Sequence, residues 1–131
     1  MGDDRNTASG PVPLVLVIDD VQEQRSALAE FLGMNGFRVA TASNGYEGLA
    51  RAVELRPDVI LMDLGMPGMD GLETAKLLKR ERVTTDIPIV AVTGQTVMSD
   101  ERFRAKGFAE LISKPCDPLQ LAAALRRILG R

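Results

Sequence analysis

Residues Val59 to Gly71 read Val-Ile-Leu-Met-Asp-Leu-Gly-Met-Pro-Gly-Met-Asp-Gly. Four apolar residues lead directly into the carboxylate Asp63, and Gly65 and Pro67 follow closely. A continuous apolar run of this length favours a strand that is buried on both faces, and glycine and proline end such a strand. Asp63 is therefore predicted to lie at the carboxyl end of a buried strand, where the ligands of open parallel sheets collect.

Length and composition fit one ordinary globular domain. The chain has 131 residues, of which 45% are hydrophobic and 26% are charged. The formal net charge of -2 gives no electrostatic reason to expect nucleic-acid binding. No apolar run approaches the roughly 20 residues that a membrane-spanning helix needs, and the polar start of the chain is unlike a signal peptide. We therefore expect a cytoplasmic protein without nucleic-acid or membrane partners.

Two residue types limit the possible chemistry. Cys116 is the single cysteine of the sequence, which excludes an intramolecular disulfide and a cysteine-rich zinc site. Histidine does not occur in the sequence, which excludes histidine-based catalytic triads, imidazole metal ligands and a phosphohistidine of its own.

Strand and helix patterns alternate along the chain. Residues 1–13 have no hydrophobic periodicity and are predicted to be a flexible N-terminal tail, and residues 14–131 are predicted to form the domain. Apolar runs predict strands at Leu14–Ile18, Phe37–Ala42, Val59–Asp63, Ile87–Val92 and Glu110–Ser113. Helical spacing predicts helices at Val21–Met34, Tyr46–Leu55, Leu72–Arg82, Met98–Lys106 and from Asp117 or Pro118 to Leu129. This alternation predicts an α/β fold whose parallel sheet is covered by helices on both faces.

Reactive side chains occur at the carboxyl ends of four predicted strands. Asp19 and Asp20 follow the first strand, Asp63 ends the third, Thr93 follows the fourth and Lys114 follows the fifth. Three neighbouring carboxylates repel one another unless they share a proton or bind a cation, and oxygen ligands suit Mg²⁺. A lysine and a hydroxyl can hold phosphoryl oxygens, which leaves one carboxylate as the nucleophile.

Each of these residues also has an ordinary structural explanation when it is taken alone. Asp19 and Asp20 are a suitable helix-capping pair, Thr93 is a common strand residue, and Lys114 is a suitable solvated charge at a strand end. It is their predicted convergence at one edge of the sheet that favours a functional site.

Four segments closely resemble the receiver domain of two-component response regulators, and the resemblance covers Leu14 to Leu129. The segments are Leu-Val-Leu-Val-Ile-Asp-Asp, the Val59–Gly71 stretch, Ile-Pro-Ile-Val-Ala-Val-Thr-Gly and Ile-Ser-Lys-Pro. The resemblance implies a flavodoxin-like (βα)5 three-layer sandwich with five parallel strands in the order 2-1-3-4-5. It also implies a phosphoacceptor module for signalling, without a separate turnover activity.

The resemblance assigns Asp63 as the phosphoacceptor. Asp19 and Asp20, together with Asp63 and the backbone carbonyl of Gly65, would hold Mg²⁺ or Mn²⁺. Gly65 also leaves one side of the acceptor open, where many relatives carry a larger side chain. We therefore hypothesise a short-lived acyl phosphate, and the decay rate of variants with Asn or Arg at this position would test that hypothesis.

The resemblance also implies that Thr93 and Lys114 contact the phosphoryl group, and that the Lys114-Pro115 peptide bond is a candidate for the cis isomer. Because the chain has no histidine, the phosphoryl donor would be a histidine kinase or a histidine phosphotransferase. The downstream target would bind the face formed by the fourth helix, the fifth strand and the fifth helix. Leu111 stands where the family usually has Tyr or Phe, which puts a conventional aromatic switch in doubt, and Cys116 is interpreted as a small packing residue.

Alternative interpretations remain at this point. The chain could be the receiver module of a hybrid histidine kinase. A small phosphohydrolase with Asp63 as nucleophile would need a general acid two residues later, where Gly65 stands. A flavin or nucleotide carrier would need a phosphate-binding loop after the first strand, where Asp19 and Asp20 would repel phosphate. A degenerate receiver would have lost part of this residue set, which is intact.

Overall fold

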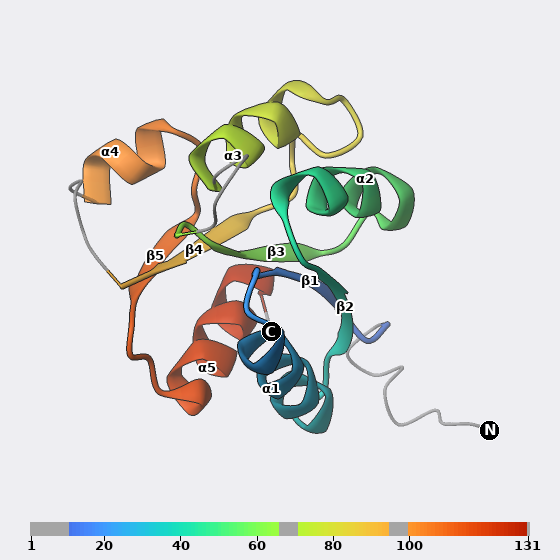
Figure 1. Cartoon of the computed structure of the whole chain (residues 1–131), viewed down its shortest axis with the longest axis vertical. Coiled ribbons are helices and arrows are strands. Elements are labelled where there is room, and N and C mark those ends of the chain that lie inside the picture. Colours follow the sequence, from blue (N-terminus) through green and yellow to red (C-terminus); the bar gives the residue numbers. More distant parts are fainter. Residues whose placement is uncertain (1–10, 66–70, 95–99, 131) are drawn as a thin grey trace.

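The computed structural model describes residues 11–65, 71–94 and 100–130, apart from the side chains of residues 100, 102 and 103. Within these residues, five parallel strands form one sheet in the order β2-β1-β3-β4-β5 (Figure 1). The strands are β1 (Leu14–Ile18), β2 (Arg38–Ala42), β3 (Val59–Asp63), β4 (Ile89–Thr93) and β5 (Glu110–Ser113). The helices are α1 (Gln22–Met34), α2 (Gly45–Leu55), α3 (Gly71–Arg80), α4 (Asp100–Ala105) and α5 (Pro118–Leu129). The predicted α/β fold and its strand order are confirmed.

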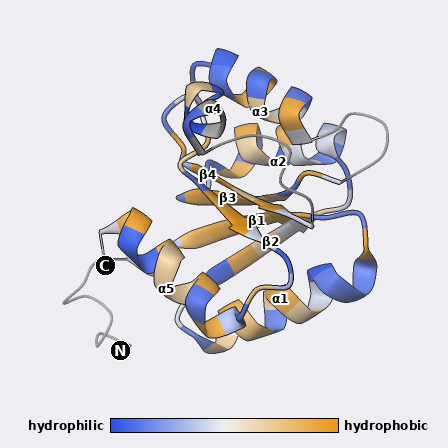
Figure 2. Ribbon diagram, turned by 90° about the vertical axis from the view of Figure 1, so that its left-hand side faces the viewer, coloured by the Kyte–Doolittle hydropathy of each residue, from blue (hydrophilic) through white to orange (hydrophobic). Residues whose placement is uncertain are grey.

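Helices cover both faces of the sheet, with α1 and α5 on one face and α2, α3 and α4 on the other (Figures 1 and 2). Ile60 and Met62 of β3 belong to the apolar cluster that includes Leu78 of α3. Val59 and Leu61 belong to the cluster on the opposite face. Each strand therefore contributes alternate side chains to two cores, which explains why the central strands are continuously apolar in sequence.

Two element ends, one on each side of the segment between α3 and β4, differ from the prediction by two residues. The Thr84 and Thr85 hydroxyls donate to the carbonyl oxygens of Leu78 and Lys79, at 2.6 and 2.9 Å. These bonds satisfy carbonyl groups of the last helical turn, and α3 ends at residue 80 instead of 82. Strand β4 begins at residue 89 instead of 87, because Pro88 has no N–H group to donate to a neighbouring strand.

Other described element ends differ from the prediction by one residue, including the starts of β2 and α2. The Phe37 N–H donates to the Leu32 carbonyl at the end of α1, so β2 begins one residue later than predicted. Helix α2 begins at Gly45, one residue earlier than predicted, because the Asn44 side chain accepts from the Glu47 N–H at 2.8 Å. The predicted start of the fourth helix at Met98 lies outside the described residues.

Residues 1–10 of the predicted tail lie outside the described part of the chain. The backbone N–H and the Nε of Arg38 donate to the carbonyl oxygens of Pro13 and Val12, at 2.9 and 3.1 Å. The division into a tail and a domain of residues 14–131 stays a prediction.

None of the helices in the described residues is long and apolar enough to cross a membrane.

Candidate functional site

The carboxyl ends of four strands meet at one edge of the sheet and bring together the side chains predicted from the sequence. Ile18 pairs with Met62, so Asp19 and Asp63 follow in adjacent strands. The N–H of Lys114 donates to the Thr93 carbonyl at 2.8 Å, so β5 delivers Lys114 beside the end of β4. The parallel arrangement alone therefore accounts for the meeting of residues that lie far apart in the chain.

Three carboxylates form a compact acidic cluster at this edge. Asp19, Asp20 and Asp63 each offer an oxygen atom, and these atoms all lie within 4.8 Å of one another. Asp19 is 4% exposed and Asp63 is 9% exposed, whereas Asp20 is exposed. Two carboxylates are thus held inside the protein surface, and the third faces the solvent.

The acidic cluster fits a hard divalent cation. Burial raises the pKa of Asp19 above its ordinary value of 3.8, and the negative charges of Asp63 and Asp20 raise this pKa further. The Val21 N–H, which donates to Asp19 Oδ1 at 2.9 Å, and the positive charge of Lys114 partly oppose this shift. A bound cation would remove the repulsion, and a set of carboxylate oxygens is what Mg²⁺ and similar ions prefer.

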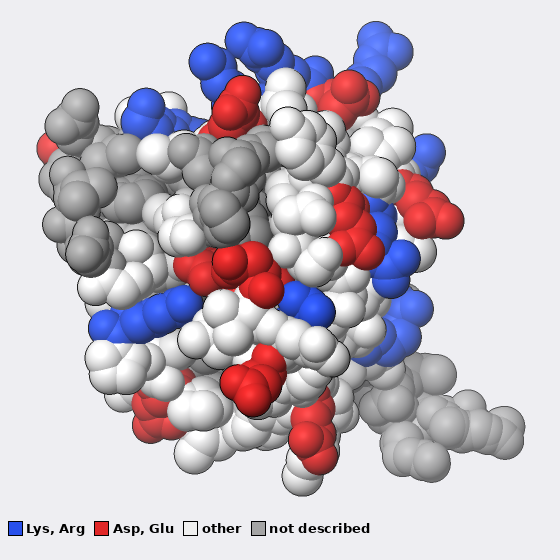
Figure 3. All heavy atoms as spheres, viewed as in Figure 1, with Lys and Arg blue, Asp and Glu red and all other residues white. Residues whose placement is uncertain are grey.

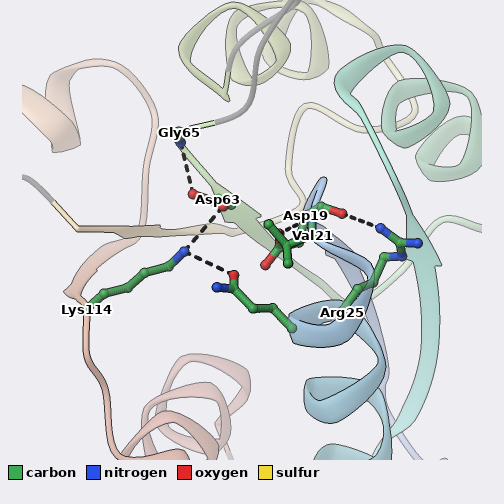
Figure 4. A network of polar contacts seen from close by, with 7 residues as sticks. Asp19, Val21, Arg25, Asp63, Gly65 and Lys114 are labelled. Carbon is green, nitrogen blue, oxygen red and sulfur yellow. Dashed lines mark hydrogen bonds and ion pairs between the residues drawn. The ribbon is translucent and has the colours of Figure 1, made fainter.

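Lys114 brings a positive charge to the Asp63 carboxylate. Its Nζ lies 3.3 Å from Asp63 Oδ2 and 3.4 Å from Gln24 Oε1 (Figure 4). The Gly65 N–H donates to the other oxygen of Asp63, Oδ1, at 2.9 Å. Both oxygens of Asp63 therefore have a donor that the protein itself positions.

Comparison with known proteins identifies the family. Residues 15–126 match the response regulator receiver domain. The chain belongs to this family. Solved structures agree, since the chemotaxis protein CheY4 of Vibrio cholerae superimposes with a TM-score of 0.82 at 33% identity, over 90% of this chain and 99% of CheY4.

Relatives of this receiver domain include proteins of similar length and longer proteins. Protein PilH of Pseudomonas aeruginosa is 31% identical over 117 residues, which cover 88% of this chain and 97% of PilH. The polar-differentiation response regulator DivK of Brucella anthropi is 33% identical, over 88% of this chain and 95% of DivK. The phosphate regulon transcriptional regulatory protein PhoB of Pseudomonas aeruginosa is 35% identical over 121 residues, and the chain spans about half of its length, 52%.

Other positions singled out in the sequence have definite places in the receiver domain. The Lys114-Pro115 peptide bond is cis, as predicted. Leu111 pairs with Ala91 in the sheet and packs against the apolar cluster on the side of α2 and α3. Cys116 is a partly exposed free cysteine.

Two residues of α1 support the site, although the sequence patterns did not single them out. The Arg25 side chain donates to the backbone carbonyl of Asp19 at 2.7 Å and so fixes the turn that carries the acidic pair (Figure 4). Gln24 accepts from Lys114, as described above. The sequence predicts that both residues lie in the first turns of the helix after Asp19 and Asp20. It does not predict which groups of other elements their side chains contact.

Gly71, the first residue of α3, lies close to the end of β3 that carries Asp63. A Cβ atom at this position would lie 3.0 Å from the Cα of Leu64 and 3.1 Å from the carbonyl oxygen of Asp63. Both of these are backbone atoms, which cannot rotate away as a side chain can. The end of β3 therefore comes this close to α3 because residue 71 is glycine.

We predict that Gly71→Ala destabilises the protein by about 1–3 kcal/mol, because the added methyl group must displace the backbone that carries Asp63. Urea denaturation monitored by circular dichroism measures the change. Gly33→Ala is the matched control, since Gly33 lies in α1 with nothing within 4 Å of its added Cβ atom. The control should be neutral or stabilise by up to about 1 kcal/mol. Equal stability of the two variants would contradict the tight contact.

Proposed function

We propose that this receiver domain accepts a phosphoryl group on Asp63 from a phosphohistidine and then signals through a protein partner. The observation that supports the proposal most strongly is the 3.3 Å contact between Lys114 Nζ and Asp63 Oδ2, directly beside the acidic cluster. A nucleophilic carboxylate, a cation for phosphoryl oxygens and a set of oxygen ligands for a metal ion are the parts that phosphoryl transfer requires.

In the proposed step, one carboxylate oxygen of Asp63 attacks the phosphorus atom. The phosphorus–nitrogen bond of the donor breaks, and the imidazole leaves with the bonding electron pair and is protonated by solvent. Lys114 neutralises negative charge on the phosphoryl oxygens, and the hydroxyl of Thr93, at the end of β4, donates to one of them. A Mg²⁺ ion held by Asp19, Asp20, Asp63 and the Gly65 carbonyl would supply further charge neutralisation, and Mn²⁺ could replace it.

The donor in this proposal is a histidine kinase or a histidine phosphotransferase of the cytoplasm. A cavity of about 490 Å³ opens beside Asp63, between α1 and the turn that contains Pro115 and Cys116. Its lining includes the apolar residues Ala27 and Leu28 of α1. This arrangement supports docking of the donor next to the acceptor carboxylate. The downstream partner would bind the face formed by α4, β5 and α5.

The proposal is tested by incubating the protein with acetyl phosphate and Mg²⁺ and measuring the intact mass. We expect an adduct of one phosphoryl group in the wild type, and no adduct in Asp63→Asn or after addition of EDTA. Asp86→Asn is the matched control, because Asp86 is an exposed carboxylate of the segment between α3 and β4, and it should form the adduct normally.

Two results would overturn this proposal. An adduct that persists in Asp63→Asn would show that another residue is the acceptor. Steady release of phosphate over many turnovers without an adduct would indicate a phosphohydrolase instead.

A further inference from the structure

A second cavity, of about 630 Å³, lies between α3 and the C-terminal end of α4. Neither the residues of the acidic cluster nor Lys114 line this cavity. Its basic lining residues, among those that the structure describes, are Lys76, Lys79, Arg80 and Lys106, and the name cationic cavity refers to these four. Figure 3 shows Lys and Arg side chains gathered along the upper edge of the molecule, where α3 lies in the same view (Figure 1).

The cationic cavity is positively charged, although the net charge of the whole chain is -2. Among the described lining residues, Glu73 is the single carboxylate. Lys76 precedes Lys79 and Arg80 by three and four residues on α3, and like charges at these spacings repel one another and destabilise a helix. An anion bound among them would remove this repulsion.

The helix dipole explains only part of this charge. Lys79 and Arg80 lie in the last turn of α3, where cations are favourable. Lys76 lies one turn earlier, and Lys106 directly follows the last residue of a different helix, α4. The cavity therefore combines three cations of α3 with one from the residue that follows α4.

Lys79 is a fixed part of the cavity wall. Its Nζ donates to the carbonyl oxygens of Thr85 and Ile87, at 3.1 and 2.9 Å. Its side-chain carbons pack over Gly107, where a Cβ atom would lie 3.1 Å from Lys79 Cγ. Burial lowers the pKa of Lys79, although the negative charge of Asp86 partly opposes this shift. The exposed side chains of Lys76, Arg80 and Lys106 surround this fixed cation and are available to a ligand.

We propose that the cationic cavity binds a small molecule that carries two or more linked phosphate groups. The volume of the cavity falls in the range of small-molecule sites, about 300–1,000 Å³. Lysine ammonium groups and an arginine guanidinium are suitable donors to several phosphate oxygens at once. Leu72 and Ala105 add an apolar wall for the rest of the ligand. Such a ligand contacts both α3 and α4, independently of Asp63.

The test uses inorganic tripolyphosphate as the probe, in EDTA so that no metal ion can bring it to the acidic cluster. Isothermal titration of the wild type should give one site per chain. The double variant Lys76→Gln/Lys106→Gln should bind the probe at least about tenfold more weakly, since two cations that would donate charge-assisted hydrogen bonds to it are removed. Arg82→Gln is the matched control, because Arg82 is an exposed cation two residues beyond α3 that does not line the cavity. It should bind the probe within about twofold of the wild type.

Three results would overturn the inference. The first is a wild type that does not bind the probe, and the second is a stoichiometry well above one probe per chain. The third is a loss of affinity in Arg82→Gln as large as in the double variant, which would indicate non-specific attraction to surface cations. Thermal unfolding of each variant by circular dichroism confirms that it is folded. Because the titration measures binding without phosphoryl transfer, its result is independent of the proposed role of Asp63.

Discussion

Lys114→Met is expected to slow the phosphorylation of Asp63 by acetyl phosphate about 100-fold, the size of effect seen when one preorganised charge-stabilising donor is removed. Lys114 Nζ lies 3.3 Å from Asp63 Oδ2, and its side chain is 30% exposed, so solvent only partly screens its charge. Methionine retains a flexible side chain of similar length and removes the positive charge. Initial rates of adduct formation, followed by intact mass at saturating Mg²⁺, measure the effect.

Arg82→Met is the matched control for this prediction, because it removes the charge of an exposed arginine after α3 that belongs neither to the acidic cluster nor to the cationic cavity. Its rate should stay within about twofold of the wild type. A Lys114→Met rate within threefold of the control would show that Lys114 does not stabilise the transferring phosphoryl group, whatever its distance from Asp63.

The second prediction concerns Asp19→Asn. This variant should bind Mg²⁺ at least about tenfold more weakly, since one of three clustered carboxylates is lost. In EDTA, however, it should unfold at a higher temperature than the wild type. Burial and the charges of Asp63 and Asp20 disfavour the ionised form of Asp19, and asparagine retains an oxygen that can accept from the Val21 N–H. A variant that binds Mg²⁺ normally would contradict the assignment of Asp19 as a ligand.

The same prediction has a definite pH dependence. Because the folded-state pKa of Asp19 is raised above 3.8, the folded protein retains this proton when the unfolded chain has already lost it. The contribution of Asp19 to stability is therefore favourable at acidic pH and is lost as the pH rises through the raised pKa. In EDTA, the difference in stability between Asp19→Asn and the wild type should be largest near pH 7 and disappear below pH 3.8, the ordinary pKa of an aspartate. Urea denaturation across this range measures it.

The sequence predicts that Asp63, Thr93 and Lys114 lie at the same edge of the sheet, because their positions follow from the direction of the strands alone. Continuous apolar runs mark strands that are buried on both faces, and parallel strands bring their carboxyl ends to one edge. The register of the sheet then places these residues in neighbouring strands. The fold and the position of the candidate site therefore follow from patterns that span only a few residues each.

Features that depend on contacts between elements were not predictable in this way. The early end of α3 depends on which carbonyl groups the Thr84 and Thr85 hydroxyls reach. The support that Arg25 gives to Asp19 depends on a side-chain conformation. The cationic cavity joins Lys76 of α3 to Lys106 beside α4, and the charge pattern of each helix alone is that of an ordinary solvated surface.

The central claim is that Asp19, Asp20, Asp63 and the Gly65 carbonyl together hold one divalent ion beside Lys114. The most direct test is an anomalous difference map from crystals grown with Mn²⁺ and beryllofluoride, a phosphoryl mimic. The account predicts one anomalous peak among the three carboxylates, with beryllofluoride on Asp63 and Lys114 Nζ in contact with a fluorine atom. A peak elsewhere on the protein, or beryllofluoride on another residue, would contradict it.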